Sequence, residues 1–378
     1  MKENLVVFFG GKSVEHDISI ITALTVMKNI NLNDYNVLPV YISGDGLWYM
    51  ADNLTDENIY QNFDKYVKNK VCVTLVMGKP YLAIRKGNKY SKFIQVNCAL
   101  LCNHGMNGED GTLQGVLELC SIPYTSCGVT SSGICMDKVF MKNIFVANKI
   151  PTTEYMYLKE NEYIKDEKKI LLTISKRLKF PIIIKPANLG SSIGISVCNS
   201  IEDLKNGIDV AFKFDSKILI EKVVTSLKEY NCACLKVEDR LILSSIDEVE
   251  SNDEIFSFDE KYLQVKTKRK NKISASMKNR IHTLTSKVYE LFDCEGIVRV
   301  DFLFDESNNI LYVNEINSIP GSMALYLFKD YKPSELIECM ILQAKFRLKD
   351  KFKRKYSFES QALNIFKDFK NSNKFSKK

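Results

Sequence analysis

Four polar side chains lie on two apolar runs on either side of the turn 305–309. Side chains two positions apart on a strand share a face, so Arg299 and Asp301 should point the same way, and so should Glu315 and Asn317. Two carboxylates and an amide oxygen are the ligands that magnesium takes beside substrate phosphates. A neighbouring arginine can stabilise negative charge that develops on a reacting carbonyl or phosphoryl group. A surface ladder of salt bridges is the alternative, but buried strands seldom hold such a set without a function.

A second group of residues is suited to phosphate binding. Lys185 ends an apolar run and precedes the glycine-rich stretch 186–194 (PANLGSSIG). Backbone N–H groups, two hydroxyls and an ammonium group can close over phosphates, and Lys138 can supply a second ammonium. A solvated lysine or an ordinary turn explains each feature alone. Their combination with the metal-type cluster favours a nucleotide site.

A third group is the loop 104–111 (HGMNGEDG), which combines an imidazole, two acids and three glycines. It follows a predicted buried strand at 96–102, and binding crevices of open α/β sheets lie at the carboxyl ends of strands. The alternative is a loop whose polar groups only cap a helix that begins near Gln114.

The elements that must position these residues follow from hydrophobic periodicity. A short apolar run at 5–9, a helical pattern at 15–29 and a strand at 37–42 predict an α/β layer with a parallel sheet. Residues 71–84 indicate a hairpin, and 131–148 a helix. The polar, irregular stretch 249–273 is a candidate mobile loop.

Length and composition set the class of protein. A chain of 378 residues with 45% hydrophobic and 26% charged residues predicts a globular protein of two or three domains. It has no apolar run of membrane-spanning length and no signal-peptide core, so we expect a cytoplasmic protein without a membrane span. The eleven cysteines form no C-x-x-C pair, and we expect free, buried thiols.

The net charge of +7 comes from the end of the chain. Residues 341–378 hold 12 Lys and Arg against 3 Asp and Glu, and the other 340 residues hold 41 against 43. A basic tail of this kind favours a solvated helix and a frayed end over a nucleic-acid-binding arm. We therefore expect no nucleic-acid partner, and we find no recognised nucleic-acid module in the chain.

The loop 104–115 (HGMNGEDGTLQG) resembles the signature loop of the D-alanine–D-alanine ligases of the ATP-grasp superfamily. The resemblance runs from about residue 4 to residue 345. Further matching pieces follow in the family's order: 9–15 (FGGKSVE), 136–138 (MDK), 184–186 (IKP), 190–194 (GSSIG), 219–222 (LIEK), 260–262 (EKY), 299–301 (RVD) and 314–317 (NEIN).

The resemblance implies a mixed α/β ATP-grasp fold with a Rossmann-like parallel sheet at its N-terminus. The implied divisions are an N-terminal domain at 1–128, a central domain at 129–225, a C-terminal domain at 226–345 and a basic tail at 346–378. The implied reaction joins two D-alanines through an acyl phosphate, at the expense of ATP, for peptidoglycan precursor synthesis. Two Mg²⁺ ions (Mn²⁺ as an alternative) and a homodimer are implied as well.

The resemblance also assigns roles to individual residues. Arg299 and the backbone N–H near Gly321 match the pair that stabilises the oxyanion, and Asp301, Glu315 and Asn317 match the metal ligands. The residues that match nucleotide contacts are Lys138, Lys185, Ser192, Glu221 and Glu229. The residues that match the substrate sites are Glu15 with its partners Ser191 and Tyr262, His104 and Glu109 at the pocket's edge, and Lys261 and Tyr326 on the acceptor side.

Tyr326 departs from the family's pattern, because it stands where a small hydroxyl side chain usually binds the acceptor's carboxylate. The acceptor's identity is therefore open between D-alanine, D-serine and, as the least favoured, D-lactate. An inactive ATP-grasp protein that only binds nucleotide is a further alternative. That alternative predicts the loss of metal ligands or of Arg299, and all of these residues are present.

Overall fold

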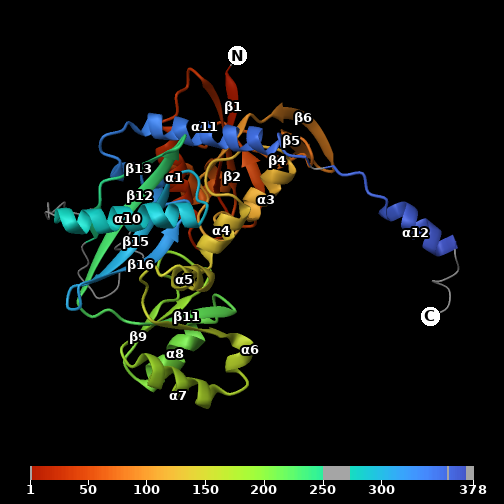
Figure 1. Ribbon diagram of the computed structural model, residues 1–378. Helices are drawn as coiled ribbons and strands as arrows, with labels where there is room; N and C mark the ends of the chain where they lie inside the picture. Colours follow the sequence, from red (N-terminus) through yellow and green to blue (C-terminus); the bar gives the residue numbers. More distant parts are fainter. Residues whose placement is uncertain (1, 250–272, 356, 372–378) are drawn as a thin grey trace.

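The computed structural model describes residues 2–249, 273–355 and 357–371. Three β-sheets, each built from one continuous stretch of chain, are covered by helices (Figure 1). The predicted domain boundaries near residues 128, 225 and 345 stay predictions, but each sheet lies within one of the three stretches that they define.

The first sheet carries the predicted strand–helix–strand unit. Strand β1 (Glu3–Gly10) pairs in parallel with β2 (Tyr35–Ile42) and with β7 (Cys98–Leu101), and α1 (His16–Met27) connects β1 to β2. Antiparallel strands extend the sheet beyond β2, and the predicted hairpin is β4 and β5. The remaining elements of this stretch are β3 (Trp48–Met50), η1 (Glu57–Asn62), α2 (Phe63–Tyr66), β4 (Val71–Leu75), β5 (Tyr81–Lys86), β6 (Lys89–Gln95) and α3 (Thr112–Leu119).

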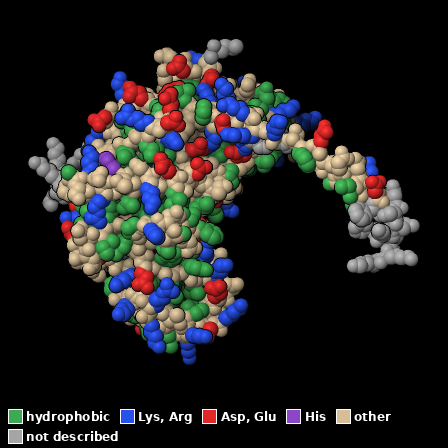
Figure 2. All heavy atoms as spheres, in the orientation of Figure 1, with side chains coloured by type: hydrophobic (Ala, Val, Ile, Leu, Met, Phe, Trp, Pro, Cys, Tyr) green, Lys and Arg blue, Asp and Glu red, His purple; other side chains and the backbone are tan. Residues whose placement is uncertain are grey.

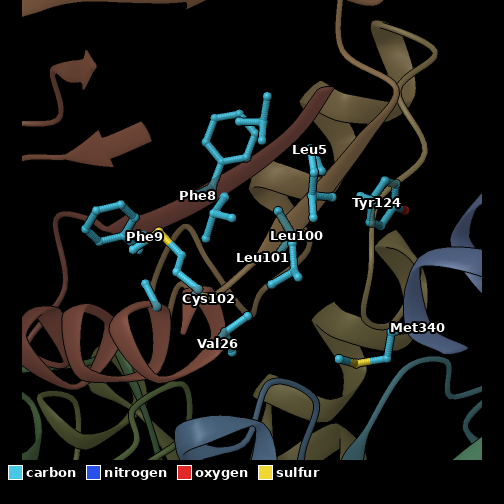
Figure 3. Close-up of a cluster of buried hydrophobic side chains, with 14 of the residues drawn as sticks. Leu5, Phe8, Phe9, Val26, Leu100, Leu101, Cys102, Tyr124 and Met340 are labelled. Carbon is cyan, nitrogen blue, oxygen red and sulfur yellow. The ribbon is translucent and has the colours of Figure 1, made fainter. Parts of the chain in front are cut away.

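The core of this sheet explains why its strands read as continuous apolar runs. Leu5, Phe8, Leu100 and Leu101 lie close together in the interior, and none of them is exposed (Figure 3). Met340 of α11 (Pro333–Lys351) belongs to the same cluster, so this late helix packs against the N-terminal sheet. Strands buried on both faces need apolar residues at successive positions.

The second sheet is antiparallel, in the order β10-β9-β11-β8. Helices pack against it in a separate small core that includes Leu171, Leu204 and Ile220. Its elements are β8 (Tyr155–Lys159), α6 (Glu160–Tyr163), α7 (Glu167–Leu178), β9 (Ile182–Pro186), β10 (Ser196–Cys198), α8 (Ile201–Ala211) and β11 (Lys217–Lys222).

One predicted helix is divided in two. Residues 131–148 form the end of α4 (Val129–Met136) and then α5 (Lys138–Ala147), separated by Asp137. The backbone of Asp137 is extended, with ψ at 100°, and its carboxylate accepts hydrogen bonds from the N–H groups of Val139 and Phe140. An aspartate at this position caps a new helix, and periodicity alone did not reveal the break.

The third sheet carries the predicted charged strands. Strand β15 (Val298–Asp305) pairs antiparallel with both β12 (Leu227–Val237) and β16 (Ile310–Asn317). Strand β12 is followed by β13 (Arg240–Leu243), and the two form an antiparallel hairpin. Helix α10 (Ala275–Leu291) packs against this sheet, and β14 (Asp247–Val249) and η2 (Gly321–Leu327) complete the unit.

The end of the described chain stands apart from the body. Helix α12 (Ala362–Asn371) projects away from the three sheets (Figures 1 and 2). Its Leu363, Ile365 and Phe366 side chains are exposed, in accord with the expected solvated helix. None of the described helices combines the length and the apolar character that crossing a bilayer would require.

Candidate active site

The carboxylate of Glu15 lies buried where α1 begins, and only 5% of the residue is exposed. The Ser191 hydroxyl donates a hydrogen bond to Oε1. The other oxygen, Oε2, is buried and has no hydrogen-bond partner among the described residues. Two glycines allow this close packing, because a Cβ on Gly190 would lie 2.7 Å from both carboxylate oxygens and one on Gly105 would lie 2.7 Å from Oε2.

The electrostatic surroundings of Glu15 disfavour its charged form. Burial is the largest cause of a raised pKa, and the nearby Glu109 carboxylate raises the pKa further. His104, Ser191 and Lys138 oppose the shift without reversing it. A buried carboxylate with an unused oxygen is a site for a cation that also donates hydrogen bonds, such as an ammonium group.

The glycine-rich turn brings Ser191 and Lys138 to the same place. Ser191 and Ser192 have left-handed backbones, with φ at 55° and 58°, so their hydroxyls project from a tight turn. Lys138 Nζ donates a hydrogen bond to the Leu189 carbonyl at 2.7 Å and lies 3.8 Å from Glu315 Oε2. Lys138 thus links this turn to the third sheet.

A buried ion cluster includes Lys185 of β9, the strand that leads into the turn. Glu221 of β11 is 1% exposed, and its carboxylate lies 2.6 Å from Lys142 Nζ and 2.8 Å from Lys185 Nζ. Burial alone would raise the pKa of Glu221, but the two ammonium groups overcome that cost and hold the pKa well below its usual range. Glu229 lies near enough to help raise the pKa of Lys185, whose burial acts in the opposite direction.

Lys142 was missed by the motif analysis. It is 1% exposed, and its ammonium group also donates hydrogen bonds to Thr152 Oγ1 at 2.7 Å and Thr153 Oγ1 at 3.0 Å. The available signal was helical periodicity, because Lys142 lies three residues after the buried Val139 and three before the buried Phe145. A lysine on the buried face of a helix requires an acid partner.

The four polar residues of the third sheet come together as strand alternation predicted. Across β15 and β16, Arg299 faces Asn317 and Asp301 faces Glu315. The Arg299 guanidinium donates to both Asp301 oxygens, at 2.6 and 2.7 Å, and Asn317 Nδ2 donates to Oδ2 at 3.0 Å. The arrangement is a bidentate ion pair beside a second carboxylate.

This donor set fits magnesium better than a softer metal. Two carboxylates and an amide on one face of paired strands offer oxygen ligands, and Mg²⁺ needs only one or two carboxylates when phosphates supply the rest. The described residues contain no cluster of three or more His, Cys, Asp and Glu side chains arranged to hold a metal. A closed site made only of protein ligands, as structural zinc requires, is therefore not found there.

His104 and Glu109 lie between the first sheet and the segment that follows β16. His104 Nε2 is 2.8 Å from Thr22 Oγ1, and its Nδ1 is 3.9 Å from Glu109 Oε2. Glu109 accepts hydrogen bonds from the N–H of Gly105 at 2.9 Å and from the N–H of Ile319 at 3.1 Å. Thr22, which also accepts a hydrogen bond from Ser322 N–H at 2.9 Å, had no sequence signal.

Tyr326 of η2 lies near the Arg299–Asp301 pair. The residue is 55% exposed. Shielding of its hydroxyl raises the pKa of Tyr326, and Asp301 and Asp247 add to the effect while Arg299 opposes it. The predicted substrate residues Lys261 and Tyr262, and most of the predicted loop 249–273, lie outside the described residues.

Family models and curated relatives of a single protein family match nearly the whole chain. Residues 4–127 match the family model "D-ala D-ala ligase N-terminus", and residues 144–335 match "D-ala D-ala ligase C-terminus". A D-alanine--D-alanine ligase of Thermosipho africanus is 37% identical over 96% of this chain and 98% of that protein. A D-alanine--D-alanine ligase of Staphylococcus epidermidis is 38% identical over 95% of this chain and 99% of that protein.

Solved structures of ligases also match most of the chain. D-alanine-D-alanine ligase from Helicobacter pylori superimposes with a TM-score of 0.74 at 27% identity, covering 90% of this chain and 98% of that one. VanG D-Ala:D-Ser ligase from Enterococcus faecalis superimposes with a TM-score of 0.77, also at 27% identity, covering 91% and 100%.

Proposed function

The chain belongs to the D-alanine–D-alanine ligase family, and from that premise we propose that it joins two D-alanine molecules at the expense of ATP. The product, D-alanyl-D-alanine, serves peptidoglycan precursor synthesis. The fold is that of the ATP-grasp ligases, as the sequence predicted.

The observation that carries the proposal is the Glu15 carboxylate. It is buried, and its Oε2 atom has no partner among the described residues. The ammonium group of an amino acid supplies both the charge and the hydrogen bonds that this oxygen lacks. A D-amino acid bound there would place its carboxylate toward the third sheet, where Lys138 already reaches Glu315.

The reaction begins when the first D-alanine's carboxylate attacks the γ-phosphate of ATP and releases ADP. Lys138, Lys185 and the Ser191–Ser192 turn would neutralise the phosphates, since ammonium groups and backbone N–H groups are suited to that task. Glu221 and Glu229 would contact the nucleoside. In this proposal ATP lies between the central and C-terminal domains, at 129–225 and 226–345.

The amine of the second D-alanine then attacks the acyl phosphate, and phosphate leaves from the tetrahedral intermediate. Arg299 and the backbone N–H of Gly321 would stabilise its oxyanion. Asp301, Glu315 and Asn317 would hold two Mg²⁺ ions, which supply charge neutralisation to the phosphates. Lys261 and Tyr326 would face the acceptor's carboxylate, and Tyr262 would join Ser191 at Glu15.

The location and oligomeric state of the ligase are part of the same proposal. We place the protein in the cytoplasm as a homodimer, as the family resemblance implies, with the small molecules D-alanine and ATP as its partners. Of the predicted basic tail at 346–378, residues up to Lys351 belong to α11, and Arg347 donates hydrogen bonds to the carbonyls of Tyr124 and Ser126. The part that would stay outside the catalytic units is the chain beyond α11, in keeping with the outward course of α12 (Figure 1).

D-serine is the second candidate for the acceptor. Tyr326 takes the place of the family's small hydroxyl residue, and the similar VanG protein is named as a D-Ala:D-Ser ligase. A single added hydroxyl changes specificity by roughly 1–3 kcal/mol, so one side chain can decide between the two acceptors.

The test is phosphate release from ATP and Mg²⁺ with D-alanine alone, then with D-serine or D-lactate added, with products identified by mass. D-Ala–D-Ala from D-alanine alone, and no mixed product in competition, supports the main proposal. Fast formation of a mixed product would show that D-serine or D-lactate, and not a second D-alanine, is the acceptor. Tight ATP binding without turnover of any D-amino acid would make the protein a nucleotide-binding relative and overturn the ligase proposal.

A further inference from the structure

We propose that Thr22 is a positioning residue for the second half of the reaction, because it holds the turn that presents the Gly321 N–H to the oxyanion. The inference rests on the proposed function for its catalytic consequence. Its structural basis is a set of hydrogen bonds that join α1 and the 104–111 loop to the segment after β16.

The first anchor is the Thr22 hydroxyl. Thr22 is completely buried on α1, and its Oγ1 accepts a hydrogen bond from the Ser322 N–H at 2.9 Å. The two residues are 300 positions apart in the chain. The N–H of Ser322 belongs to the peptide group that follows Gly321, so this bond fixes the orientation of that group.

The second anchor is the Glu109 carboxylate. Its Oε1 accepts a hydrogen bond from the Ile319 N–H at 3.1 Å. The N–H groups of Ile319 and Ser322 are thus held from the N-terminal side, one before and one after Gly321. The Pro320–Gly321 peptide, which carries the Gly321 N–H, lies between these anchors, and its carbonyl accepts a hydrogen bond from the Met323 N–H at 2.7 Å.

His104 connects the two anchors. Its Nδ1 faces Glu109 Oε2 at 3.9 Å and its Nε2 lies 2.8 Å from Thr22 Oγ1. With a proton on Nδ1, which faces a carboxylate, a neutral His104 has an acceptor at Nε2. The Thr22 hydroxyl can therefore donate to Nε2 while it accepts from Ser322 N–H.

The turn needs this external support. Ser322, Met323 and Ala324 have φ values of 49°, 52° and 47°, three successive residues in the left-handed region without a glycine. Residues with a Cβ adopt that conformation unfavourably, and it persists where surrounding contacts hold it. Met323 and Ala324 are buried against the same core as α1, and Thr22 provides the polar part of the support.

The test compares Thr22→Val with Thr22→Ser. Valine keeps the shape and apolar packing of threonine but cannot accept the Ser322 N–H, whereas serine keeps the hydroxyl. We expect Thr22→Val to lower kcat for dipeptide formation about tenfold, which corresponds to about 1.4 kcal/mol, with KM for ATP unchanged. The kcat of Thr22→Ser should stay within about twofold of the wild-type value, because serine keeps the hydrogen bond to the Ser322 N–H.

Two further readouts separate positioning from general destabilisation. Positional isotope exchange in ATP, which reports acyl phosphate formation, should persist in Thr22→Val while dipeptide formation falls. Amide hydrogen exchange in residues 318–325 should quicken in Thr22→Val alone. Equal loss of both half-reactions, equal loss in both variants, or unchanged exchange in this segment would each overturn the inference.

The amide exchange measurement does not depend on turnover. If the unchanged protein forms no dipeptide, the proposed function fails, and the exchange comparison still decides whether Thr22 holds the turn. Quickened exchange in an inactive protein would support the structural link alone and overturn its catalytic part.

Discussion

Glu15 and Glu221 are both buried, with 5% and 1% of each residue exposed, yet their pKa values move in opposite directions. Burial is the largest influence on each, and by itself it raises both values. Glu221 lies between the ammonium groups of Lys142 and Lys185, which reverse the effect. Glu15 has the hydroxyl of Ser191 and a second acid, Glu109, nearby, so its pKa stays raised.

The difference separates a carboxylate that the protein neutralises itself from one that a ligand must neutralise. The ammonium groups of Lys142 and Lys185 belong to the fold, so Glu221 is neutralised within the protein itself. The charge of Glu15 is only partly compensated, by His104 and Lys138, and its Oε2 atom has no hydrogen-bond partner among the described residues. In the proposed function the ammonium group of the substrate supplies the missing partner. Burial therefore marks both residues as unusual, and only their partners tell the two roles apart.

The largest effect is expected when the Glu221 charge is removed. Glu221→Gln leaves Lys142 as a buried ammonium group without its counter-ion, and such a loss costs about 3–5 kcal/mol of folding free energy. Urea unfolding monitored by circular dichroism measures it. The double variant Glu221→Gln with Lys142→Met should recover much of the loss, and equal stability of the single and double variants would contradict the coupling.

The matching change at Glu15 is expected to act on activity instead. Glu15→Gln removes an uncompensated charge, so the free energy of unfolding should not fall. Loss of the ammonium partner should lower kcat/KM for the first D-alanine about 10²-fold, about 2.7 kcal/mol. Initial-rate kinetics at saturating ATP tests this, and a variant that loses stability but keeps kcat/KM would reverse the comparison.

A smaller effect should follow when Glu15 loses its hydrogen-bond donor. The Ser191 hydroxyl favours the charged carboxylate, so Ser191→Ala should raise the pKa of Glu15 further. Ammonium binding needs the charged form, and the acidic limb of the kcat/KM profile should therefore move to higher pH, with about a tenfold loss at neutral pH. A pH profile that keeps its acidic limb in Ser191→Ala would exclude Glu15 as the titrating group.

The last prediction concerns the sign of the pH dependence of stability, which should be opposite at the two sites. Because the pKa of Glu15 is raised in the folded protein, its contribution to stability is fully present below about 4.5 and is lost as pH rises through the folded-state pKa. The lowered pKa of Glu221 gives stability above about 4.5 that is lost as pH falls. The free energy of unfolding in urea should be measured as a function of pH for Glu15→Gln, Glu221→Gln and the wild-type protein. As pH rises, the wild-type protein should lose stability relative to Glu15→Gln and gain stability relative to Glu221→Gln.

Local periodicity predicted much of the fold and one part of the candidate site. The placing of Arg299 beside Asp301, and of both opposite Glu315 and Asn317, followed from strand alternation and was confirmed. The helix expected over 131–148 was wrong at Asp137, because a capping aspartate inside an apolar pattern looks like one exposed position of a continuous helix.

The sequence by itself determined the types of chemistry available to this protein: the candidate oxygen ligands, the glycine-rich turn at 186–194, the loop at 104–111 and the strands that carry them. Those features depend on neighbouring residues and on the fixed geometry of strands and turns. The tertiary structure decided which charges are compensated and which polar groups are hydrogen-bonded. The partners of Glu15, Glu221 and Thr22 come from elements distant in the chain. Burial and counter-ions are properties of packed elements, and the order of residues alone does not specify them.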